Sequence, residues 1–243
     1  MSVQWRDFSE FVASRRTTRD FLQAPVPPEL IDELLRDAMT APSWSNTRPY
    51  LVGIATGEKR DRISRELLTR WQAAAKALRG GWWGKAKLLL TRTGLPTSDY
   101  KVFRRYPKDL VPRQQKVGAE LYGLLEIKRD DHVARQAQWA RNYEFFGAPV
   151  ELFVFTHSGL GEYSVSDAGL FMQNLMLSAH ARGLGTCAQG AVALWADPIR
   201  KEFDVPAGYK LLCGIALGYP SDHKVNSFQA ERLDISEIKL KDV

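Results

Sequence analysis

The part of the chain that decides the fold begins at Ser164 and ends at Gly190, and it reads SVSDAGLFMQNLMLSAHARGLGTCAQG. Its apolar residues are spread around the helical turn and leave no broad polar face, which is typical of a buried helix. Asp167 is the expected N-cap, and Gly183 and Gly185 are expected to end the helix. Polar residues interrupt the stretch too often for a membrane span. We therefore expect this helix to lie at the centre of a hydrophobic core.

The segment after this helix, Gly183 to Ala191, consists mostly of small residues. We expect a tight loop there, whose backbone amides can approach a flat ligand closely because glycine has no side chain. An ordinary connection between two elements is the alternative interpretation of this stretch taken alone.

The composition is that of a folded protein. The 243 residues are 44% hydrophobic and 26% charged, so we expect a single domain over residues 1–243 with one large core. Residues 2–16 lack the apolar run of a secretory signal, and two cysteines are too few for a disulfide framework. No spacing of cysteines and histidines is typical of zinc. We therefore expect a reducing, cytoplasmic setting, with no metal site and no membrane partner.

The net charge of +6 raises the question of nucleic-acid binding. The basic residues are scattered and mixed with acidic ones, whereas a nucleic-acid surface needs them on one face together with exposed aromatic residues. A basic balance suits an anionic small-molecule cofactor equally well. We expect no nucleic-acid partner, and a non-enzymatic basic binding protein is the weaker alternative.

Periodicity predicts several helices and three buried strands. The expected helices cover residues 5–14, 28–40, 57–79, 113–128, 130–143, 167–182 and 197–203, with Asp197 as the N-cap of the last. The expected strands cover residues 51–55, 150–155 and 210–218. Residues 80–112 are expected to form an irregular excursion or lid. Residues 221–243 are expected to form an arm that packs on another subunit.

Arginines are concentrated directly after the first helix, in the run Arg15-Arg16-Thr17-Thr18-Arg19. Guanidinium groups interleaved with hydroxyl groups can enclose a phosphate through forked hydrogen bonds. A solvated helix end, where cations interact favourably with the helix dipole, is the alternative. A second polar loop, residues 41–50, connects a helix to a strand, and binding sites are common in such loops.

Four stretches together resemble the FMN-dependent nitroreductase family. They are residues 15–19, the loop from Ala41 through Pro49, the long helix with Gly183-Leu184-Gly185-Thr186, and residues 214–232. The segments 142–149 and 225–228 look most like the branch that reduces nitrobenzoate and nitrobenzene. The resemblance implies an α+β fold with a mixed central sheet flanked by helices. It also implies an intertwined homodimer in which the C-terminal arms are exchanged between the subunits.

The same resemblance implies an FMN site at the arginine run. Arg15 and Thr17 match the positions that hold the FMN phosphate and ribityl chain, and Arg232 matches the phosphate-binding residue of the arm. Arg19 matches the cation beside the flavin pyrimidine. A cation there would stabilise the negative charge of the reduced flavin.

The rest of the implied site comes from other stretches. Ser43 and Asn46 match loop residues that contact FMN across the dimer, and the backbone near Gly190 and Ala191 matches the support of flavin N5. The other residues that we predict to contact the cofactor are Arg16, Pro42, Arg48, Asn142, Ala188 and Gln189. The chain departs from many relatives in carrying Arg48 in place of Gln and Ala188 in place of Pro.

The activity implied by the resemblance is a two-step hydride relay. NADH or NADPH reduces FMN at N5 and leaves, and a nitroaromatic or related flat acceptor then takes the electrons at the same face. The flavin itself performs this chemistry, so no catalytic side chain is expected, and the four histidines form no acid–base pattern. Reduction of quinones or enones, reductive dehalogenation and flavin chemistry are alternative reactions on the same fold.

Overall fold

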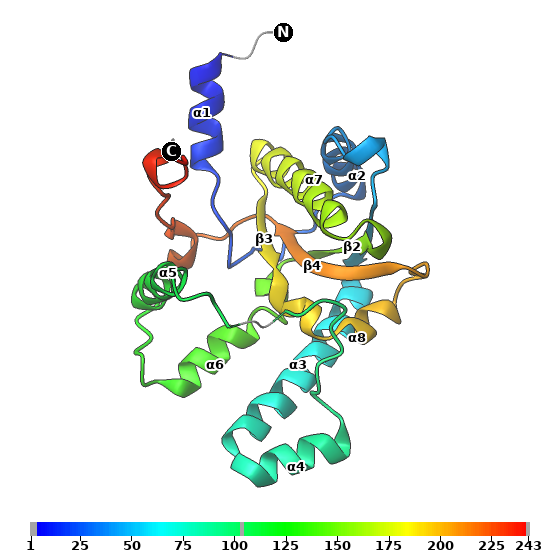
Figure 1. The fold of residues 1–243 in the computed structure, drawn as a ribbon, viewed down its shortest axis with the longest axis vertical. Helices are drawn as coiled ribbons and strands as arrows, with labels where there is room; N and C mark the ends of the chain where they lie inside the picture. Colours follow the sequence, from blue (N-terminus) through cyan, green and yellow to red (C-terminus); the bar gives the residue numbers. More distant parts are fainter. Residues whose placement is uncertain (1–3, 103–104, 242–243) are drawn as a thin grey trace.

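A four-stranded sheet lies in the middle of the molecule, and Figure 1 shows it in a computed structural model that describes residues 4–102 and 105–241. The strands are β1 Tyr50–Thr56, β2 Val150–His157, β3 Gly185–Gln189 and β4 Tyr209–Gly218, in the order β1-β2-β4-β3. All three neighbouring pairs are antiparallel. The sheet is therefore antiparallel rather than mixed as predicted, and the described residues form one parallel bridge outside its strands, between Thr17 and Thr186.

Helices lie on both sides of this sheet, as predicted for an α+β fold (Figure 1). They are α1 Trp5–Ser14, α2 Pro28–Ala38, α3 Gly57–Arg79, α4 Gly81–Thr91, α5 Val111–Leu124, α6 His132–Ala140, α7 Glu162–Ala181 and α8 Ala196–Arg200. Short 3-10 helices cover Trp44–Asn46, Phe145–Gly147, Ser158–Leu160, Gly190–Leu194, Lys224–Ser227 and Ile235–Glu237. The bounds of α1 and α3 are as predicted, and the other predicted strands and helices shift by a few residues at their ends.

Strand β2 is buried on both faces, which explains its nearly continuous apolar sequence. Successive side chains of a strand point to opposite faces. Leu152 and Val154 therefore belong to a core that contains residues of α2 and α7. Phe153 and Phe155 belong to a second core, which contains residues of α3 and α8. The predicted single large core is thus divided by the sheet into two layers.

The predicted start of the long helix is wrong. Helix α7 begins at Glu162, and Asp167 lies inside it, where its carboxylate accepts a hydrogen bond of 3.0 Å from the backbone N of Trp44. The carboxylate of Asp167 therefore bonds to a residue distant in the sequence and does not cap its own helix. The predicted end is confirmed, because Gly183 follows the helix with φ of 72°. One side of α7 packs in the core, whereas Leu170 on another side is 45% exposed.

The predicted tight loop after α7 is also wrong, because residues 185–189 form the edge strand β3. The open edge of β4 offers backbone partners to these residues, from the pair Gly185–Gly218 to the pair Gln189–Gly214. A small residue is needed at position 185 for close packing against Thr18, and not for a tight turn. A side chain at Gly185 would place its Cβ only 2.3 Å from Oγ1 of Thr18.

The predicted excursion at 80–112 is partly regular, because it contains α4 packed beside α3 (Figure 1). A glycine of α4 permits the close approach of these two helices. A Cβ on Gly84 would lie 2.4 Å from the backbone oxygen of Ala77. Residues 103–104 of this excursion, residues 242–243 of the predicted arm and residues 1–3 of the predicted domain lie outside the described residues.

Helix α8 begins one residue earlier than predicted, and the expected N-cap Asp197 lies inside it. Its carboxylate instead pairs with Arg70 at 2.6 Å and accepts a hydrogen bond from Thr97. These contacts fasten α8 to α3 and to the chain after α4.

The two ends of the chain project from the rest of the molecule (Figure 1). Helix α1 has no buried residue, and Trp5 is 69% exposed. The arm differs from its prediction at its start, since Val225 is buried within its own chain. Further along, the arm contacts α5 of its own chain through the ion pairs Lys116–Glu231 and Arg113–Glu237.

One carboxyl group lies in the core without a hydrogen-bond partner. Glu151 on β2 is fully buried, and both of its carboxylate oxygens are unpaired. Burial raises the pKa of this carboxyl well above its ordinary value, and the charge of Arg60 opposes the shift. In the unfolded chain the carboxyl ionises at about pH 4.3. The folded state thus retains a proton that the unfolded state loses, so the stability decreases as the pH rises above that value.

We expect Glu151→Met, which has a similar volume and no ionisable group, to raise the free energy of unfolding at pH 8. The gain over the wild type should shrink toward pH 5, because the loss of the proton on unfolding favours the unfolded wild type less as the pH falls. Urea denaturation at the two pH values measures this difference. Glu58→Met is the control, because that side chain is 97% exposed and its substitution should give no pH-dependent gain. An equal change at both pH values for Glu151→Met would contradict the expectation.

Candidate functional site

The predicted arginine run lies on the extended segment between α1 and α2, beside strand β3. The backbone N of Thr18 donates to the carbonyl oxygen of Thr186 at 2.9 Å. The missing side chain of Gly185 makes this close approach possible. The first residues of β3 and the arginine run therefore form one structural unit.

A cavity of about 350 Å³ lies where this unit meets the end of α7 and the turn after β4. Its lining includes Arg15, Arg16, His180, Gly185, Ser221 and Asn226. His180, one of the four histidines that form no acid–base pattern in the sequence, is thus part of the cavity wall. Burial lowers the pKa of His180, and the charges of Arg15 and Arg16 lower it further.

The charge of this region is not compensated by carboxylates. In the part of the chain that the structure describes, Arg15, Arg16, Arg19 and Arg232 have no carboxylate within ion-pair distance. The pKa of Arg15 lies below its ordinary value because the group is partly buried and because Arg232 repels its charge. An anion with several acceptor oxygens would relieve this repulsion, so the residues present fit a phosphate group.

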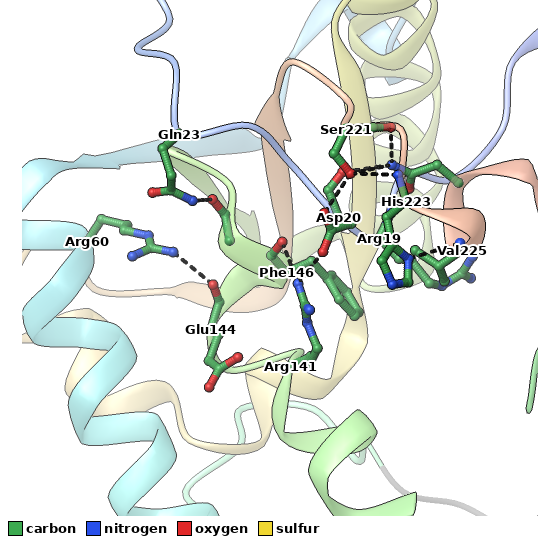
Figure 2. Close-up of polar contacts among 12 residues, drawn as sticks. Arg19, Asp20, Gln23, Arg60, Arg141, Glu144, Phe146, Ser221, His223 and Val225 are labelled. Atoms are coloured by element: carbon green, nitrogen blue, oxygen red, sulfur yellow. Dashed lines mark hydrogen bonds and ion pairs between the residues drawn. The ribbon is translucent and has the colours of Figure 1, made fainter. Parts of the chain in front are cut away.

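A hydrogen bond holds the backbone of Arg19 in place, within a network of polar contacts that Figure 2 shows. Its backbone N donates to Oδ1 of Asn226 at 2.8 Å. The neighbouring Asp20 accepts hydrogen bonds from Ser221 at 2.6 Å and from Arg141 at 2.8 Å. Three distant segments, the arginine run, the turn after β4 and the chain after α6, are thereby joined around Arg19.

The far end of β3 brings together other predicted residues. The side-chain amide of Gln189 donates to the carbonyl oxygen of Asn142 at 2.7 Å, and its own oxygen is buried without a partner. Ala188 and Gly190 are exposed, and Ala191 is partly exposed. No atom lies within 4 Å of the position that a Cβ on Gly190 would take. The backbone at Gly190, about 16 Å along the strand direction from Gly185, is therefore open to a ligand.

The remaining predicted residues, Pro42, Ser43, Asn46 and Arg48, lie on the loop before β1. The backbone φ angle is positive at Ser45 (47°), Asn46 (57°) and Arg48 (44°). Non-glycine residues rarely adopt such angles, and residues that do are concentrated at functional sites. The hydroxyl of Ser43 accepts a hydrogen bond of 3.0 Å from the backbone N of Arg48, which stabilises the loop.

This loop and the arginine run lie near opposite ends of α7. The loop contacts Asp167, and the arginine run lies beside His180. Thirteen residues of helix separate these two positions, which amounts to about 20 Å. The predicted site residues therefore form two groups in one chain. The arginine group contains Arg15, Arg16, Thr17, Arg19 and Arg232 with the nearby residues Asn142, Ala188, Gln189, Gly190 and Ala191, and the loop group contains Pro42, Ser43, Asn46 and Arg48.

Neither cysteine has the environment of a reactive thiol. Cys187 and Cys213 are free and buried, and burial raises the pKa of each thiol to about 12. Cys187 is a small residue of the core. Within residues 4–102 and 105–241, no three His, Cys, Asp or Glu side chains are arranged to hold a metal ion. No helix in that part is long and apolar enough to cross a membrane.

The chain belongs to the nitroreductase family, because the model of that family matches residues 12–219. It is 35% identical over 237 residues to a 4-nitrobenzoate reductase of Pseudomonas putida, covering 96% of this chain and 94% of the relative. It is also 30% identical over 234 residues to a nitrobenzene nitroreductase of Ectopseudomonas oleovorans, covering 96% and 93% of the two chains. The resemblance predicted from the four sequence stretches is therefore confirmed, including the branch.

A solved structure shares the whole architecture. It is the FMN-dependent nitroreductase NfnB of Mycobacterium smegmatis in complex with NADPH, with a TM-score of 0.82 and 28% sequence identity. The match covers 98% of this chain and 99% of that chain. The predicted nitroreductase fold is confirmed.

Proposed function

We propose that this protein is an FMN-dependent oxidoreductase that uses NADPH or NADH to reduce nitroaromatic compounds or related flat acceptors. The observation that supports this most directly is the group of uncompensated arginines beside the first residues of β3, the strand whose far end has an open backbone. Membership of the nitroreductase family, the two nitroarene-reducing relatives and the NADPH complex of NfnB support the same conclusion.

The arginine group fits FMN in its chemistry. Arg15 and Arg232 would hold the phosphate, and Arg19 would stabilise negative charge on the pyrimidine side of the ring. The open backbone at Gly190 and Ala191 would face flavin N5. FMN, when bound, supplies the hydride-transfer chemistry, and the protein binds and orients it.

A homodimer would complete the site. The loop group is separated from the arginine group by most of the length of α7, so a second copy of the chain is needed to bring the two groups together. A two-fold axis would place the loop of each chain at the arginine group of the other. Exposed apolar residues are available for such a contact, including Trp5 on α1, Leu170 on α7 and Ile238 on the arm. We also propose that the two chains exchange their C-terminal arms. The two free cysteines support a cytoplasmic location.

The steady-state kinetic pattern tests the proposed function. If one flavin face serves both reductant and acceptor, the two substrates must take turns. We expect parallel lines in double-reciprocal plots when NADPH is varied at several fixed concentrations of a nitroarene. Intersecting lines would show that both substrates are bound together and would contradict the alternating mechanism.

A further inference from the structure

A second cavity, of about 580 Å³, lies between α5 and α6. Its volume is in the usual range for small-molecule sites. The lining includes Lys116, Gly118, Tyr122, Gly123, Arg129 and Arg135, and no Asp or Glu is present among the described residues that line it. Neither α5 nor α6 buries a residue in the chain, so this cavity is an open part of the molecule.

Two of the cations that line the cavity have no carboxylate partner among the described residues. Lys116 pairs with Glu231 of the arm. Among the ion pairs of residues 4–102 and 105–241, none includes Arg129 or Arg135. Two unpaired guanidinium groups in one cavity favour an anion, and their forked donors match the oxygens of a phosphate.

The same cavity has a flat surface for an aromatic ring. The guanidinium carbon of Arg135 lies 4.1 Å from the centre of the Tyr122 ring, so the two planar groups support each other. Nucleic-acid bases stack readily on such aromatic and guanidinium planes. On α5, no atom lies within 4 Å of the position that a Cβ would take on Gly118 or Gly123. This part of the helix surface is therefore open to a flat ligand.

The position of the cavity connects it to the proposed flavin site. Helix α6 runs from beside α5 toward the end of β3 (Figure 1). Just beyond α6, the carbonyl oxygen of Asn142 accepts the hydrogen bond from Gln189. Seven residues separate Arg135 from Asn142, which corresponds to about 10 Å along a helix. An extended dinucleotide can span such a separation.

We propose that this cavity binds the 2′-phosphoadenosine end of NADPH and thereby makes NADPH the preferred reductant. Arg129 and Arg135 bind the 2′-phosphate, and the adenine ring stacks on the surface formed by Tyr122 and Arg135. This inference rests on the proposed function, which brings the dinucleotide to the flavin. NADH lacks the 2′-phosphate, so it makes no use of Arg129 and contacts Arg135 only through its adenine ring.

The test combines kinetics with direct binding. We expect Arg129→Ala and Arg135→Ala each to raise the KM for NADPH by ten- to a hundredfold, since hydrogen bonds to charged groups contribute about 1.5–3 kcal/mol. In Arg129→Ala the KM for NADH and the kcat with either reductant should stay within twofold of the wild type. Arg135→Ala should also raise the KM for NADH, by less than it raises the KM for NADPH, because the adenine ring loses part of its stacking surface. Arg65→Ala, on the exposed surface of α3, is the matched control and should change neither KM.

Calorimetry with adenosine 2′,5′-bisphosphate measures the cavity without turnover. We expect the wild type to bind it at least tenfold more tightly than adenosine 5′-monophosphate, and both arginine variants to lose this difference. Equal affinity of the wild type for the two nucleotides would overturn the proposal. Displacement of the bisphosphate by benzoate would also overturn it, because the cavity would then bind the aromatic acid. Reduction of the wild-type flavin by NADPH, with an unchanged KM in both variants, would overturn this proposal and leave the proposed function intact.

Discussion

Replacing Arg15 or Arg232 with alanine is expected to weaken FMN binding by ten- to a hundredfold in each case. Hydrogen bonds to charged groups contribute about 1.5–3 kcal/mol, and each arginine is expected to make at least one to the phosphate. Burial lowers the pKa of Arg15, and repulsion by Arg232 in the protein without FMN lowers it further. Removal of either one should therefore leave the stability of the apoprotein unchanged or slightly higher.

Titration of the apoprotein with FMN, followed by flavin fluorescence, measures this affinity. Thermal unfolding of the same apoproteins separates a loss of binding from a loss of folding. Arg6→Ala is a suitable control, because this arginine lies over the ring of Trp5 on the projecting helix α1. Unchanged FMN affinity in both Arg15→Ala and Arg232→Ala would remove these residues from the site.

Mixing two defective variants is expected to restore FMN binding. One variant combines Arg15→Ala with Arg232→Ala, and the other carries Asn46→Asp. Aspartate tolerates the positive φ of residue 46 and places a negative charge beside the anionic cofactor. Each variant alone should retain little FMN, since every site of its own dimer is damaged.

Hybrid dimers behave differently if each site takes its two groups of residues from different chains. The substitutions of both variants then fall in one of the two sites of the hybrid dimer, and the other site is intact. After random mixing, about a quarter of all sites should therefore bind FMN. Co-expression of two differently tagged chains, with flavin content measured after purification, gives this fraction. FMN content no higher than the mean of the two separate variants would contradict the two-chain site.

The sequence was most informative where local signals and tertiary structure agree. The bounds of α3 were predicted correctly, because its period is regular and glycines lie at both of its ends. Helix α4 was missed because residues 80–112 were predicted to be irregular, whereas Gly84 allows α4 to pack closely on α3. Strand β3 was missed because its small residues show no strand pattern, and pairing with β4 determines its conformation.

The residues of the site were likewise predictable only where the sequence itself contains a local signal. The arginine run stands out in the sequence, because three guanidinium groups lie within five residues. Its separation from the loop at 42–48 depends on the length and direction of α7, which only the fold reveals. Arg129 and Arg135 gave no signal, because each lies in an ordinary charged stretch and only the packing of α5 beside α6 brings them together around Tyr122.

The central claim is that this protein transfers electrons from a nicotinamide nucleotide to a nitroarene through bound FMN. The most direct test is the flavin absorbance of the purified protein in the absence of oxygen. NADPH alone should bleach the flavin, and a nitroarene added after the nucleotide is consumed should restore the oxidised spectrum. A flavin that stays oxidised with both NADPH and NADH would contradict the account.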